Sequence, residues 1–133
     1  MSRHLNEQLL DAACQGNTVT IRKMIAAGAN PNYQNEQINT PLMWAVTHRH
    51  LDAAQVLLES GANVNGQDCL GGTALMVAAS NGDLPMLEML LKAGGDAHVT
   101  DHDGNNARVW AAHNNHVEAA RLLQDWESTH DAP

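Results

Sequence analysis

The fold is decided by residues 40–65, which read TPLMWAVTHRHLDAAQVLLESGANVN. Thr40 is a good helix N-cap, and Pro41 follows at the first helical position, where a missing N–H costs nothing. The stretch therefore predicts a short helix, a tight turn and a second helix. Gly61 then supplies the left-handed residue that ends the second helix.

This unit recurs along the chain with a period of 33 residues. Gly61 has equivalents one period before and one period after it, Gly28 and Gly94. A fixed period of this length indicates one supersecondary unit stacked about four times. We expect a single domain over 1–133, with repeats at about 5–37, 38–70, 71–103 and 104–126 and a flexible tail at 127–133.

Composition and charge narrow the possible function classes. The chain has 133 residues with 15 acidic and 7 basic side chains, a net charge of −8. This balance argues against nucleic acids and anionic membranes as partners, and it permits a protein partner with a basic surface. Cys14 and Cys69 fall in different units, so we expect free thiols, as in a reducing compartment. No signal-like or 18-residue apolar segment is present, so we expect a soluble cytoplasmic protein.

The inner units resemble the ankyrin repeat motif, which runs roughly Gly-x-Thr-Pro-Leu-His-x-Ala-Ala, a Gly-His turn, a Leu-Leu helix and Gly-Ala-Asp-Val-Asn. The matching segments are 40–46, 57–65, 71–79 and 81–83, and the resemblance covers about residues 5–126. It implies an all-α repeat solenoid of stacked helix–turn–helix ankyrin repeats with short β-hairpin fingers. It also implies protein binding along the concave side of fingers and first helices. Members of the family are overwhelmingly not enzymes, so no cofactor is expected.

The chain departs from the motif at several positions. The motif's His is replaced in every unit, by Leu10, Met43, Met76 and Val109, so the stack should depend more on apolar packing. Ile38 stands where the later fingers keep Gly71 and Gly104, so the first finger should be distorted. Arg108 and Gln124 replace leucines of the inner units, as expected of a terminal repeat that faces water.

Helical spacing locates one face of the stack. Leu42, Ala45 and Val46 share a stripe of their helix, and Trp44 points away from that stripe. The equivalent positions in the other units hold Asp11, Val77 and Trp110. Because stacked helices lie roughly 8–10 Å apart, Trp44 and its equivalents in the third and fourth units should form a ladder about 20 Å long.

The resemblance places this ladder in the concave groove, so we predict a protein-binding site there. Its residues are Asp11, Trp44, Val77 and Trp110 from the helices and Tyr33, Leu70 and His102 from the finger tips. Tryptophan is enriched at interface hot spots, and exposed apolar patches usually mark interaction sites. The alternatives are that each Trp folds over the neighbouring helix and covers small alanines, and that the tips show ordinary loop variation.

Eight histidines raise the question of a metal site. A stable site needs three or four ligands, whereas the chain offers pairs such as His113 and His116. His50 and His116 are equivalent positions about 20 Å apart in the stack, so they cannot share a metal ion. We therefore expect no metal, and we expect the turn histidines to cap helix ends.

No catalytic motif is present: the sequence has no Gly-x-Ser-x-Gly elbow, no phosphate-binding loop after a strand and no His-Glu-x-x-His. The interpretation is a non-catalytic adaptor or inhibitor that is monomeric when free and binds an unidentified protein. Two alternatives remain open, a self-associating structural protein and a histidine-based metal-binding protein.

Overall fold

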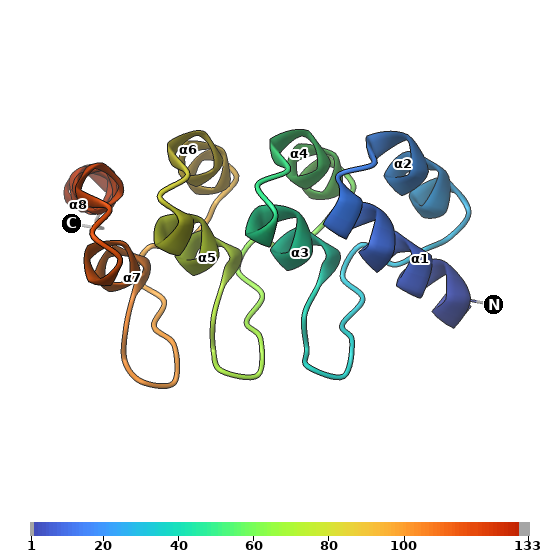
Figure 1. Cartoon of the computed structure of the whole chain (residues 1–133), viewed down its shortest axis with the longest axis horizontal. Helices are drawn as coiled ribbons and strands as arrows, with labels where there is room; N and C mark the ends of the chain where they lie inside the picture. The colour runs from blue at the N-terminus through green and yellow to red at the C-terminus, as the bar shows by residue number, and fades with distance from the viewer. Residues whose placement is uncertain (1, 131–133) are drawn as a thin grey trace.

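The computed structural model describes residues 2–130, and within them the chain forms eight helices and no strand. The helices are α1 (Ser2–Gln15), α2 (Thr18–Ala26), α3 (Pro41–Thr47), α4 (Leu51–Glu59), α5 (Ala74–Asn81), α6 (Leu84–Lys92), α7 (Ala107–His113) and α8 (Val117–His130). They stand in two rows, with the first helix of every unit in one row and the second helix in the other (Figure 1). The expected all-α repeat fold is confirmed.

Side-chain caps start the first helices as the sequence predicts. The Thr40 hydroxyl accepts a hydrogen bond from the Met43 N–H at 3.3 Å, and Thr73 does the same for Met76 at 3.3 Å. Asn106 takes this role in the last unit, where it accepts the Val109 N–H at 3.0 Å. Each cap pairs a backbone N–H that the first helical turn leaves without a partner.

The repeated apolar positions build one continuous core. Leu57, Leu90 and Leu123 are all fully buried, and the alanines at the repeated first-helix position are buried too. Alanine lets neighbouring first helices approach closely, so α3 packs on both α1 and α5, and α5 packs on α7. The row of first helices is therefore held between the second helices and the loops.

Three loops project from the row of first helices (Figure 1). We call them the first, second and third fingers, residues 30–40, 63–73 and 96–106. Each is closed at its tip by a backbone bond across four residues: Asn35 N–H to the Asn39 carbonyl, Asp68 to Gly72, and Asp101 to Asn105, at 3.1, 2.8 and 2.9 Å. Because residues 2–130 contain no β-strand, the expectation of β-hairpin fingers is not confirmed.

The first finger is not distorted, contrary to our expectation. Ile38 adopts φ 63°, the left-handed conformation that Gly71 and Gly104 adopt at φ 82°. The Ile38 N–H donates to the Asn35 carbonyl at 2.9 Å, which is the same turn that Gly71 makes with Asp68. A β-branched residue is strained in this conformation. The first finger therefore makes the same turn as the other two, and the backbone of Ile38 is strained.

The last helix is longer than the sequence indicated. Residues 127–130 were expected in a flexible tail, yet α8 continues through His130. Glu127 lies in this extra turn, where its side chain is largely covered and its carboxylate lies 3.9 Å from the Arg108 guanidinium. The rest of the expected tail, 131–133, lies outside the described residues.

The turn histidine of the second unit does not cap its helix, which corrects our expectation. His50 occupies the N-cap position of α4 without a side-chain capping bond. Its Nε2 instead pairs with the Cys14 carbonyl of the preceding unit at 3.0 Å. The imidazole covers Gly16, and His116 covers Gly82 in the same way. These histidines join neighbouring repeats.

Candidate partner-binding face

The three ladder residues Trp44, Val77 and Trp110 are all half-buried and pack on the core. Each therefore covers part of its own helix row and still presents an edge to solvent. We call the ladder positions together with the three fingers the finger face. It is the side of the stack on which the resemblance places partner binding.

Trp44 belongs to an aromatic stack at one end of the ladder. Its indole lies over the His48 ring, with ring centroids 5.9 Å apart and planes inclined by 12°. His48 in turn stacks on His50, with centroids 6.2 Å apart. These contacts orient the indole along its helix.

Trp110 is held in a different way, by a carboxylate of the third finger. Its indole Nε1 donates to Asp101 Oδ2 at 3.0 Å. The other oxygen, Oδ1, accepts the backbone N–H groups of Asp103 and Asn105, both at 2.9 Å. Asp101 is 8% exposed, so these hydrogen bonds replace most of those that its carboxylate would make to water. The hydrogen bonds of Asp101 therefore fix the Trp110 side chain relative to the third finger.

The hydrogen bonds keep Asp101 ionised. The backbone N–H of Asn105 contributes most to lowering the pKa of this carboxyl below its ordinary value of 3.8. Burial acts in the opposite direction, and the Asp103 N–H, the Trp110 indole and nearby His102 lower the pKa further. A fixed negative charge therefore lies beside the indole.

The second and third fingers are joined at their tips. The His102 N–H donates to the Leu70 carbonyl at 3.0 Å. Gln67 Nε2 bridges the same two fingers, reaching the carbonyls of Gly71 at 2.9 Å and Thr100 at 3.3 Å. Leu70 and His102, two residues of the predicted site, are therefore neighbours.

Gly71 permits this approach. A Cβ at Gly71 would stand 2.7 Å from His102 Cδ2 and 2.9 Å from the His102 backbone nitrogen. The equivalent residue of the first finger is Ile38, which has a side chain where Gly71 has none. Among the described residues, no equivalent backbone bond joins the tips of the first and second fingers.

A pocket of about 150 Å³ opens where these two fingers meet the first helices. Its lining combines apolar side chains with two carboxylates: Asp68, Leu70, Gly72, Met76, Val77, Ser80, Asn81, Asp101 and Trp110. Leu70 is 71% exposed at the rim, which is high for a large apolar side chain. Three of the predicted site residues, Leu70, Val77 and Trp110, therefore meet at one pocket.

The other predicted residues lie elsewhere. Asp11 is exposed on α1, and Tyr33 is half-buried in the first finger. Neither of them, nor Trp44, lines the pocket, and His102 lies exposed at the finger tips beside it. Their role in binding stays a prediction.

The part played by Asp101 was not predicted from the sequence, because Asp is a common turn residue. It does form the turn, as Asn35 and Asp68 do in the other fingers. The available signal was the spacing of nine residues between Asp101 and Trp110, which places a carboxylate opposite a ladder residue. That spacing alone does not show that the two side chains meet.

The finger face is acidic. The three fingers carry Glu36, Asp68, Asp96, Asp101 and Asp103 and contain no Lys or Arg. Helices α3 and α5, which hold Trp44 and Val77, also contain no charged residue. All seven basic residues of the chain lie elsewhere: Arg3, Arg22, Lys23, Arg49, Lys92, Arg108 and Arg121.

Within residues 2–130, no group of three or more His, Cys, Asp or Glu side chains is arranged to hold a metal ion. None of the helices described is both long enough and apolar enough to cross a membrane.

Comparison with known proteins agrees with the geometry. A family model described as ankyrin repeats (3 copies) matches residues 9–101 and again 75–132. No curated protein matches the chain closely enough to count as a relative. Ankyrin repeats are generally protein–protein interaction modules and are typically not enzymes. The chain belongs to the ankyrin repeat family, as shown by the match over most of its length together with its 33-residue period and its helix pairs.

Proposed function

We propose that this protein is a non-catalytic adaptor or inhibitor that binds a partner protein through its finger face. The observation that carries the proposal is the pocket between the second and third fingers. There an exposed leucine, Leu70, stands beside an indole that is already oriented by Asp101. A preordered aromatic anchor loses little conformational entropy when a partner binds.

The partner is expected to present a basic segment with apolar side chains. Charge complementarity supports this, since the fingers carry five carboxylates and no cation. The apolar lining at Val77 and Met76 can accept the aliphatic stem of a Lys or Arg side chain, while Asp68 and Asp101 lie within the same pocket. Such a partner would bind faster and more tightly at low ionic strength.

We place the protein in the cytoplasm as a monomer when free. Two free cysteines, Cys14 and the exposed Cys69, support a reducing compartment.

The test is a pull-down from the native cell's lysate at low and high salt, with Leu70→Ser beside Val19→Ser. Val19 is a matched control because it is also an exposed apolar side chain, 61% exposed, on α2. A partner that the wild type and the control retain should be weakened about tenfold or more by Leu70→Ser and lost at high salt.

Two further variants map the face. Trp110→Ala should weaken the same partner, and Trp44→Ala shows whether the contact extends along the ladder. Circular dichroism confirms that each variant is folded. Undiminished capture by folded Leu70→Ser and Trp110→Ala would contradict binding at this face.

A further inference from the structure

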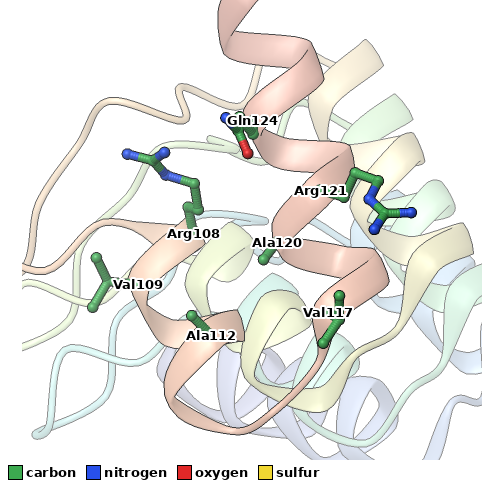
Figure 2. Close-up of a pocket in the computed structure, with 7 residues that line it drawn as sticks. All are labelled: Arg108, Val109, Ala112, Val117, Ala120, Arg121 and Gln124. Carbon is green, nitrogen blue, oxygen red and sulfur yellow. The ribbon is translucent and has the colours of Figure 1, made fainter.

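A second candidate binding surface lies at the C-terminal end of the stack. Helices α7 and α8 flank an open groove of about 470 Å³. Its lining is formed by Arg108, Val109, Ala112, Val117, Ala120, Arg121 and Gln124. Figure 2 shows Arg108 on α7 and Arg121 on α8, with Ala120 between the two side chains.

The groove is the surface on which another helix pair would stack. In the third unit the equivalent of Val109 is Met76, which is 2% exposed because α7 packs over it. Val109 itself is 43% exposed, and Val117 is 64% exposed. Val109, Ala112 and Ala120 of the groove stand at the positions of Met76, Ala79 and Leu87, which are buried in the third unit. Val117 stands at the position of Leu84, which is only half-buried there, and it adds a further exposed apolar side chain to the groove.

The rim of the groove differs in charge from the inner units. Arg108 stands at the position of Leu75, and Arg121 stands at the position of Glu88. The lining therefore holds two cations and no carboxylate. The groove is therefore positively charged, although the chain as a whole has a net charge of −8.

Arg108 is only weakly neutralised within the chain. Glu127 lies 3.9 Å from its guanidinium, and the Arg108 side chain stays 42% exposed. An ion pair at this distance contributes little, and Glu127 Oε1 is buried without a hydrogen-bond partner. The guanidinium therefore has donors left for a carboxylate from outside.

We propose that this groove binds an acidic amphipathic helix of a second partner protein. The helix would lay apolar side chains on Val109, as α7 does on Met76 inside the stack, and on the exposed Val117. Its carboxylates would meet Arg108 and Arg121. The finger face and this groove have opposite charges. The protein would then bridge two partners, one basic and one acidic.

The test is a selection from a displayed library of helical peptides with leucines spaced at i, i+3/i+4 and i+7 and with Glu or Lys at the flanking positions. The full chain is the bait, and selected peptides are then measured against single variants by titration. Arg121→Glu removes a rim charge and leaves the Arg108–Glu127 pair intact. Val117→Ser removes part of the apolar floor.

Matched controls separate the groove from general effects. Lys92→Glu makes the same change in net charge at an exposed site on α6. Val19→Ser removes an exposed valine from the first turn of α2, at the other end of the stack. We expect Glu-rich helices that lose about tenfold or more in affinity with each groove variant and less than about twofold with each control. Leu70→Ser should leave their affinity unchanged.

Three results would overturn the proposal. The first is enrichment of Lys-rich or neutral helices. The second is acidic helices that bind Arg121→Glu as tightly as the wild type. The third is a dimer in sedimentation velocity that Val117→Ser abolishes, because the groove would then belong to a second copy of the chain.

Discussion

Trp110 of α7 and Asp101 of the third finger are joined by a hydrogen bond of 3.0 Å between the indole Nε1 and Oδ2. The bond connects the row of first helices to the loop that forms one wall of the pocket. Asp68 makes the same two backbone bonds in the second finger, but the ladder residue there is Val77, which has no donor. The second finger, with Asp68 and Val77, is therefore a control for the effect of the Asp101–Trp110 bond.

Asp101→Asn should destabilise the protein, whereas Asp68→Asn should be close to neutral. Asn35 shows that an amide oxygen can close a finger, since its Oδ1 accepts the Gln37 and Asn39 N–H groups at 3.0 Å. In Asp101→Asn, however, an amide N–H would face the indole N–H. We expect a fall of a few degrees in Tm for Asp101→Asn alone, measured by thermal unfolding, with altered tryptophan fluorescence. Equal Tm values for the two variants would contradict the bond.

The same carboxylate predicts a pH dependence of stability. The folded pKa of Asp101 lies below its ordinary value of 3.8, so folding favours the ionised form. Its stabilising contribution is therefore present above that ordinary pKa and is lost as the pH falls through the folded pKa. The difference in free energy of unfolding between wild type and Asp101→Asn should be constant near neutral pH and shrink below about pH 4, as measured by urea titrations. A difference that grows on acidification would contradict the assignment.

Gly71→Ala should destabilise the protein more than Gly104→Ala. Both glycines have φ 82°, so both variants carry the same backbone strain of about 1–2 kcal/mol. A Cβ at Gly104 meets nothing within 4 Å, whereas a Cβ at Gly71 would stand 2.7 Å from His102 Cδ2. The excess loss in Gly71→Ala, measured by urea unfolding, reports the contact between the two fingers. Equal losses would show that the tips can separate freely.

Ile38→Gly should stabilise the protein by about 1 kcal/mol. The residue is held at φ 63°, and glycine adopts this conformation without the steric cost that a β-branched side chain carries. Ile38 is 39% exposed, so its substitution also loses apolar burial, and we expect the relief of backbone strain to outweigh that loss. The measurement is the urea midpoint, and a lower midpoint than wild type would show that the side chain contributes packing that outweighs the strain.

Gly82→Ala should cost about 1–3 kcal/mol, because the next repeat leaves no room for a side chain. The φ of 65° at Gly82 adds backbone strain, which Arg49 and Asn115 already carry at the equivalent turns with φ 62° and 64°. A Cβ at Gly82 would lie 2.5 Å from Nδ1 of His116. In a double-mutant cycle, His116→Ala should recover part of the loss. Additive effects would contradict the contact.

Local chemistry made much of the fold predictable. Thr40 and Thr73 cap their helices through a hydroxyl and an N–H three residues apart, and such contacts are set by the sequence within one turn. The 33-residue period predicted the stacked arrangement of the units, because each unit can bury its apolar face only against a copy of itself. The undistorted first finger could not be predicted in this way, since Ile38 is held at φ 63° against its local preference. The extra turn of α8 was missed as well: Glu127 stands at the position of Gly94, which ends the second helix of the preceding unit.

The sequence by itself determined the repeat, the caps, the ladder positions and the acidic character of the fingers, because these properties depend on residue type and spacing along one chain. Only the tertiary structure decided which side chains meet. Asp101 reaches Trp110, and Leu70 meets His102, because neighbouring repeats stack closely enough to bring their fingers and helices together. The stack also decided that Met76 is buried while Val109 is exposed, since α7 packs over Met76 and no helix among the described residues packs over Val109 in the same way. Burial in a solenoid is a property of the neighbour as much as of the residue.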